Sequence, residues 1–102
     1  MKTYKLSYST KARDDLNSLY DFLLEIDVDL AARAIDTIDS AVNAMRHHPY
    51  ICRKAANGAL GRYWRELIVD FSSSGYLVLF QITDEDTLLI VAVKHQRESD
   101  YH

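Results

Sequence analysis

The chain has 102 residues, of which 48% are hydrophobic and 26% are charged, and it contains only three glycines and one proline. This length and composition predict a single folded domain over residues 1–102 and exclude an extensively disordered chain. The formal net charge of −3 argues against strong general binding to nucleic acid, because such binding depends on neutralising phosphates with Lys and Arg.

Neither a membrane span nor a secretion signal is expected from the sequence. No apolar run approaches the roughly 18 residues that a membrane span needs. The N-terminal stretch "MKTYKLSYS" lacks the apolar segment of a signal peptide. Cys52 is the only cysteine, so an internal disulfide and a cysteine-based metal site are both excluded. We therefore expect a cytoplasmic protein without metal ions or other cofactors.

The N-terminal half of the chain is typical of one strand followed by two helices. Residues 3–8, "TYKLSY", alternate apolar and polar side chains as a half-buried strand does. Apolar residues spaced by three and four positions then predict a first helix over 10–26, capped by Ser9 or Thr10. The same spacing predicts a second helix that is capped by Asp29 and stops before Pro49. The short turn between them predicts an antiparallel pair.

The C-terminal half is typical of three antiparallel strands joined by short turns. These strands are predicted at 63–71, 76–83 and 87–95. The last one is apolar without alternation, so it should lie inside the sheet with both faces covered. The predicted fold is therefore α+β in the order β-α-α-β-β-β, with an N-terminal helical hairpin packed on a mainly antiparallel four-stranded sheet.

The segment over residues 49–62, "PYICRKAANGALGR", has no clear period and is long for a connection within so small a domain. Loops of this length are usually functional or ordered by a partner.

Charge is also distributed unevenly along the chain. Residues 14–39 contain eight acids and one base, whereas residues 46–65 contain no acid and five bases: Arg46, Arg53, Lys54, Arg62 and Arg65. One segment of an acidic protein is thus locally basic.

The last strand runs directly into a polar C-terminus, "VAVKHQRESDYH". His95, Arg97 and Tyr101 are suitable types for an acid, a base and a phosphate contact, which makes them candidate catalytic residues. Two other roles are open for His95 and Arg97. They could recognise a target, or they could brace the end of the sheet, with Arg97 bridging to Glu66 or Asp70.

Several stretches of the chain together resemble the RelE/ParE family of toxins from type II toxin-antitoxin modules. They are "RELIVDF", "SSGYLVLFQI" and "VAVKHQRESDY", preceded by an N-terminal strand and a helical hairpin that ends in "HHP". The resemblance implies a bacterial toxin that a cognate antitoxin neutralises, often as part of a plasmid stabilisation system. The family divides into RelE-like, metal-independent endoribonucleases that cut mRNA on the ribosome and ParE-like inhibitors of DNA gyrase.

Nuclease members of this family carry two lysines on the second strand and an arginine after the "GY". The corresponding positions in this chain are Ile68, Asp70 and Leu77. Cations at such positions offset the charge that builds on a phosphate during cleavage, and losing one donor costs about 10²–10³ in rate. The resemblance therefore favours a ParE-like toxin that inhibits its target by binding, with DNA gyrase as the target it implies and no enzymatic activity.

Three other functions are open at this point. The first is a RelE-like ribosome-dependent endoribonuclease. The second is an inactive descendant that still binds its antitoxin, and the third is an unrelated small α+β binding module. The apolar side chains of Leu77 and Leu79 would need a cover, which a homodimer or an antitoxin in a toxin-antitoxin hetero-oligomer could provide.

An antitoxin of this kind would lay an amphipathic segment in a groove beside the helical hairpin or across the sheet. Two roles are open for Arg65, a surface ion pair or part of a recognition surface. Two are open for Trp64 as well, an anchor of the core or an anchor of an interface. The residues predicted to bind the target or the antitoxin are Arg53, Lys54, Arg62, Trp64, Arg65, His95 and Arg97.

Overall fold

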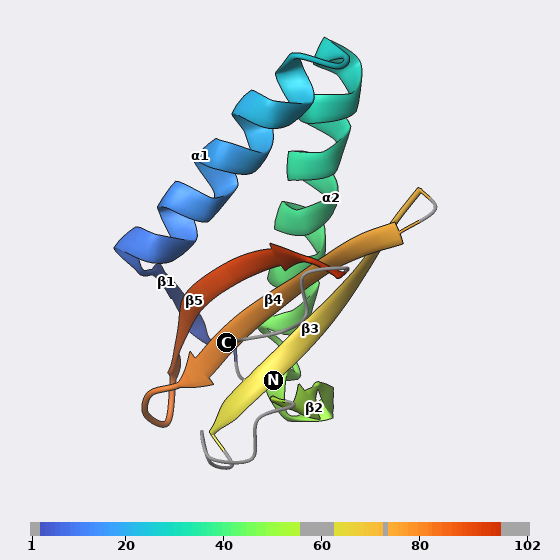
Figure 1. The fold of residues 1–102 in the computed structure, drawn as a ribbon. Coiled ribbons are helices and arrows are strands. Elements are labelled where there is room, and N and C mark those ends of the chain that lie inside the picture. Colours follow the sequence, from blue (N-terminus) through green and yellow to red (C-terminus); the bar gives the residue numbers. More distant parts are fainter. Residues whose placement is uncertain (1–2, 56–62, 73, 97–102) are drawn as a thin grey trace.

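A helical hairpin covers one face of a five-stranded sheet in the computed structural model, which describes residues 3–55, 63–72 and 74–96 (Figure 1). The helices are α1 (Thr10–Leu24) and α2 (Val28–Met45), and a short 3-10 turn, η1 (Pro49–Ile51), follows them. The strands are β1 (Lys5–Tyr8), β2 (Arg53–Lys54), β3 (Trp64–Phe71), β4 (Ser74–Ile82) and β5 (Thr87–His95). The α+β class and the order of the predicted elements are confirmed.

The strands lie in the order β1-β5-β4-β3-β2, so the last predicted strand is inside the sheet, as expected. β1 runs parallel to β5, and the other neighbouring strands are antiparallel. The prediction of four strands is wrong by one. Arg53 and Lys54 pair with Glu66 and Arg65 of β3, so part of the predicted loop forms a short edge strand.

Side-chain caps set the start of both helices. The Ser9 hydroxyl accepts a hydrogen bond from the backbone N–H of Ala12 at 3.0 Å, which confirms Ser9 as one of the two predicted caps. The prediction that Asp29 caps the second helix is wrong. Asp27 has extended backbone angles and accepts from the N–H of Asp29 at 2.8 Å, so Asp29 already lies in the first turn of α2.

The main core lies between the helices and the sheet. α2 buries one stripe of small and branched side chains, and the middle of β4 and β5 contributes the largest fully buried ones, Phe80, Leu88 and Ile90. Gly75 sits at a close approach of two strands. A Cβ atom there would collide with the backbone oxygen of Val69, so β4 needs glycine at this position.

Helix α1 continues the hydrogen bonding of β5 where β1 ends. β1 pairs only with the first half of β5, from Thr87 to Ile90. Beyond it, the Ser9 hydroxyl donates to the carbonyl of Val91 at 2.8 Å. The backbone N–H of Val93 donates to Oδ2 of Asp15 at 2.9 Å. These two bonds fix α1 along the β5 edge and satisfy backbone groups that burial would otherwise penalise.

The far end of the helical hairpin projects beyond the sheet (Figure 1). α1 ends at Leu24, two residues earlier than predicted, because the carbonyl of Leu23 accepts the N–H groups of both Ile26 and Asp27. Tyr20 and Ile26, which lie near this end, are exposed. Within the described ranges, no helix is long and apolar enough to cross a membrane.

The Asp15 contact predicts a large difference between two neighbouring carboxylates. Asp15→Ala leaves the partly buried Val93 N–H without its acceptor and should lower the free energy of unfolding by about 1–3 kcal/mol. Asp15→Asn retains an acceptor oxygen and should lower the free energy of unfolding by a smaller amount. Asp14→Ala, at an exposed position, should change stability by less than about 0.5 kcal/mol. Urea denaturation of the three variants measures the difference, and equal losses at positions 14 and 15 would contradict this role.

Candidate functional site

The sheet face opposite the helices, here called the outer face, contains the positions where nuclease members carry lysines and an arginine. The strand register sets Ile68 directly opposite Leu77 and places Asp70 two residues further along β3. A shallow pocket of about 280 Å³ on this face is lined by Arg53, Ile68, Asp70, Leu77 and Gln96. Its described lining thus includes one base, one acid and otherwise neutral side chains.

Arg53, the basic residue that lines this pocket, is paired with an acidic residue of the same chain. Its Nε lies 3.0 Å from Oε1 of Glu66, whose side chain is only 1% exposed, while Arg53 itself is about half exposed. Glu66 was a predicted partner of Arg97, and in the structure it pairs with Arg53. Arg97 lies outside the described residues, so its bridge to Glu66 or Asp70 stays a prediction. Arg53 is therefore an ion-pair residue that anchors the edge strand β2.

Arg65 braces the backbone that leads into β2. Its Nη1 donates to the carbonyl of Cys52 at 3.0 Å and to that of Tyr50 at 3.5 Å. Its guanidinium also lies 5.3 Å from the centre of the Tyr50 ring, a cation-π contact. Neither of the two roles predicted for Arg65, surface ion pair or recognition residue, describes these contacts. Burial raises the pKa of the neighbouring Cys52 thiol, and the positive charge of Arg65 partly offsets this rise.

His95 lies on the helix side of the sheet and not on the outer face. It pairs with Tyr76 in the β4–β5 register, and its Nε2 is 2.9 Å from the hydroxyl of Ser74. The rings of Tyr76 and His95 meet edge to face, with centroids 5.7 Å apart. The sheet therefore separates His95 from Ile68 and Leu77. Of the three candidate catalytic residues His95, Arg97 and Tyr101, the structure describes His95, so their grouping stays a prediction. Arg62, Arg97, Tyr101 and His102 lie outside the described residues.

Two apolar side chains of the outer face, Leu77 and Leu79, are buried within the chain, while Ile68 on the same face is 45% exposed. Leu79 packs in a second small cluster with Ala55, Ala92 and the partly buried Trp64. Leu77 is buried as well. The expectation that Leu77 and Leu79 need a cover from a partner is therefore wrong, because the segment around β2 folds over this part of the sheet. Trp64 acts as an anchor of this cluster.

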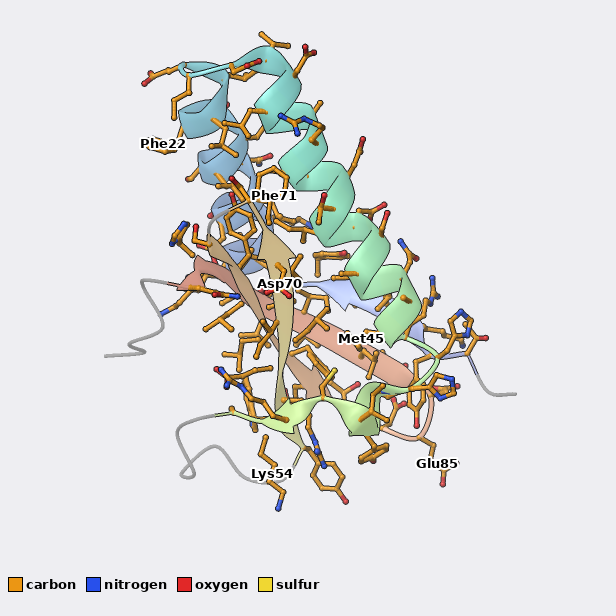
Figure 2. All side chains as sticks on the ribbon, turned by 90° about the vertical axis from the view of Figure 1, so that its right-hand side faces the viewer. Phe22, Met45, Lys54, Asp70, Phe71 and Glu85 are labelled. Carbon is orange, nitrogen blue, oxygen red and sulfur yellow. The ribbon has the colours of Figure 1, made fainter. Side chains whose placement is uncertain are left out.

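Sequence reasoning did not locate a groove of about 600 Å³ between the helical hairpin and the β3–β4 end of the sheet. Figure 2 shows Phe22 and Phe71, two of its lining residues, near the end of the molecule where the hairpin meets the sheet. Burial raises the pKa of the Tyr76 phenol in its wall. The apolar lining comes from both helices and three strands: Leu19, Phe22, Leu23, Leu30, Phe71, Tyr76 and Val93.

Polar groups lie at the same groove. Asp15, Lys94 and His95 line it, together with Ser18, Ser72 and Ser74. Serine hydroxyls, an imidazole, an ammonium and a carboxylate beside an apolar floor suit an amphipathic polypeptide segment. Among the described residues, no three His, Cys, Asp or Glu side chains are grouped so that they could hold a metal ion.

These features define a small α+β domain with an apolar groove between its helical hairpin and its sheet. Comparison with known families gives its class: a family model described as the ParE toxin of the type II toxin-antitoxin system parDE matches residues 6–100. The chain therefore belongs to the ParE toxin family of type II toxin-antitoxin systems. A characterised relative, Toxin RelE3 of Caulobacter vibrioides, is 31% identical over 98 residues, which cover 96% of this chain and 98% of that protein.

Two solved structures have a similar fold. The chromosomal ParDE toxin-antitoxin system from P. aeruginosa contains a chain that matches with a TM-score of 0.72 and 17% identity, covering 91% of this chain and 96% of that one. The toxin-antitoxin complex RelBE2 from Mycobacterium tuberculosis matches with a TM-score of 0.54 and 23% identity, covering 92% and 99%. At these identities the likeness establishes the shared fold.

The buried Glu66 predicts a measurable cost for removing Arg53. Arg53→Ala removes one ion-pair partner of a buried carboxylate and should lower the free energy of unfolding by about 1–3 kcal/mol. This is less than for a fully buried pair, because Arg53 is half exposed. Adding Glu66→Gln should recover part of this loss, because a neutral amide costs less to bury. Thermal and urea denaturation measure the stability of the single and the double variant. A loss in Lys54→Ala as large as in Arg53→Ala would contradict the ion-pair explanation.

Proposed function

We propose that this protein is a ParE-like toxin that inhibits DNA gyrase by protein-protein contact and is neutralised by a cognate antitoxin. The proposal rests mainly on the outer face of the sheet. Where a nuclease would hold a phosphate, this chain has Ile68, Asp70 and Leu77, and the neighbouring Arg53 is paired with Glu66. A phosphate at that position would meet an acid and apolar side chains, which repel it or leave its charge unbalanced.

The position of His95 also supports an inhibitor that is not a nuclease. A general acid or base must lie within hydrogen-bond reach of the reacting atom. His95 instead contacts Ser74 and Tyr76 on the helix side, on the other side of the sheet from the outer-face pocket. We assign His95 to bracing β4 against β5 and to the wall of the large groove.

The groove between the hairpin and the sheet is the site that we propose for the antitoxin. It is about 600 Å³ in volume, and its apolar floor is large enough to receive several side chains from one face of an amphipathic helix. Lys94 and His95 at its border can meet acidic or polar groups of that helix. The two structural relatives come from toxin-antitoxin systems, which agrees with an antitoxin as the partner.

A second candidate function has one observation in its favour. The relative with 31% identity is named as a RelE toxin, and the RelE-like class cuts mRNA on the ribosome. An arginine beyond β5 could contribute to such a site, and Arg97 is the residue to test. An inactive descendant that keeps only its antitoxin binding is the third possibility.

Two assays with the same purified protein separate these functions. A ParE-like toxin should inhibit DNA supercoiling by gyrase in proportion to its concentration, and addition of the cognate antitoxin should restore supercoiling. The same preparation should leave ribosome-bound mRNA uncut. Cleavage of the message at defined positions, abolished in His95→Ala or Arg97→Ala, would assign the chain to the nuclease class. No effect in either assay would identify an inactive descendant.

Lys54 offers a direct test of charge pairing with the antitoxin. Unlike Arg53 and Arg65, which are engaged by groups of the same chain, Lys54 is exposed on the edge strand β2 and points away from the rest of the molecule (Figure 2). Lys54→Glu should weaken binding of an acidic antitoxin several-fold, mainly through a slower association rate at low salt. Lys5→Glu, at the opposite edge of the sheet, is the matched control. Equal affinity of the Lys54 variant and the wild type would exclude Lys54 from the interface.

A further inference from the structure

The tip of the helical hairpin exposes three large apolar side chains, of which Phe22 also lines the groove and Ile26 and Val28 do not. Phe22 is 62% exposed, Ile26 is 61% exposed and Val28 is 64% exposed, all within seven residues of the chain. Phe22 lies in the last turn of α1, Ile26 follows the end of that helix and Val28 begins α2, so all three lie around the connection of the hairpin. Exposed apolar residues that stand singly are normal, but a cluster of this kind with a polar border marks an interaction surface.

The border of this cluster is acidic. Asp21, Glu25, Asp27 and Asp29 all lie at the tip and are exposed. None of these four carboxylates takes part in an ion pair with any described residue, and Asp27 alone is engaged as the cap of α2. Arg33, one turn after Asp29, is the nearest base in the sequence. The tip is therefore an apolar centre within a negatively charged rim.

We propose that the hairpin tip, defined by Phe22, Ile26, Val28 and their acidic rim, is a docking surface for an amphipathic protein segment that presents apolar anchors flanked by Lys and Arg. The apolar cluster supplies the buried centre of such an interface, and the carboxylates supply charge complementarity with a basic partner. The surface lies at the opposite end of the molecule from β2, with its exposed Lys54 (Figures 1 and 2). The tip adjoins the groove proposed for the antitoxin through Phe22, whereas Ile26 and Val28 belong to the tip alone.

The negative charge of the rim indicates which kind of molecule can bind at the tip. Nucleic acid and anionic membranes carry the same sign of charge as the rim and would be repelled. Two hairpin tips in a symmetric dimer would bring like charges together, at a cost. A second copy that presented its β2 edge to the tip would have matching charge, but that contact is heterologous and would propagate into rings or filaments. A basic segment of another protein satisfies both the apolar and the charged part of the surface.

A pair of designed peptides tests this inference on the full-length toxin. The probe is an 18-residue amphipathic helix of Leu and Lys, and the matched control has Glu in place of every Lys. We expect the Leu/Lys peptide to bind with an affinity that falls as salt rises, and to shift the backbone amide signals of residues 20–30 in heteronuclear NMR spectra. The Leu/Glu peptide should bind at least about tenfold more weakly.

Variants at the tip locate the binding. The double variant Ile26→Ser/Val28→Ser leaves the antitoxin groove unchanged, because neither residue lines it, and should weaken Leu/Lys peptide binding about tenfold. Glu25→Gln/Asp29→Asn should remove most of the salt dependence while the Asp27 cap stays in place. Ile51→Ser and Glu85→Gln, exposed positions far from the tip, are the matched controls and should bind as the wild type does.

Several results would overturn the inference. These are equal binding of the two peptides, amide shifts outside residues 20–30, or equal losses in the tip and control variants. Sedimentation of the free toxin as concentration-dependent oligomers that Ile26→Ser/Val28→Ser dissolves would assign the tip to a second copy of the chain instead. Because the readout is peptide binding, it is independent of whether gyrase or the ribosome is the target of the proposed toxin.

Discussion

The contact between α1 and the edge of β5 is the interaction on which the rest of the architecture depends. β1 reaches only the first half of β5, and the helix supplies the missing partners through the Ser9 hydroxyl and the Asp15 carboxylate. Ser9 also begins the helix, so one residue sets both where α1 starts and where it meets the sheet. With α1 fixed along this edge, the hairpin must lie over β3, β4 and β5, which creates the groove and leaves the tip beyond the sheet.

The parts of the fold that hydrophobic periodicity controls could be predicted from the sequence, and the parts that single contacts control could not. β3, β4 and β5 and both helices followed from alternation, turn residues and three-to-four spacing, because each buries one side of a regular element. β2 has two residues and therefore no period; it depends on the Arg53–Glu66 pair. Asp27 and Asp29 are equivalent as sequence signals for a cap, and only the backbone angles distinguish them.

The candidate site was harder to predict because it depends on register between strands. Alternation within one strand placed Ile68 with Asp70, and Leu77 with Leu79, on common faces. Alternation alone does not show on which face of the sheet His95 lies. That depends on the β4–β5 register, which sets His95 beside Tyr76. The groove was missed for a related reason. Its lining comes from five elements, so no single stretch of sequence carries its pattern.

The parallel pairing of the first and fifth strands has a consequence for when this protein can become active. β5 lies between β1 and β4, so the central part of the sheet cannot assemble until residues 87–95 have been synthesised. Contacts between the two ends of a chain raise its contact order and delay folding relative to local structure. The helical hairpin can form early, but the groove needs Val93 and His95. A growing chain on the ribosome therefore has no complete groove before residues 87–95 have emerged.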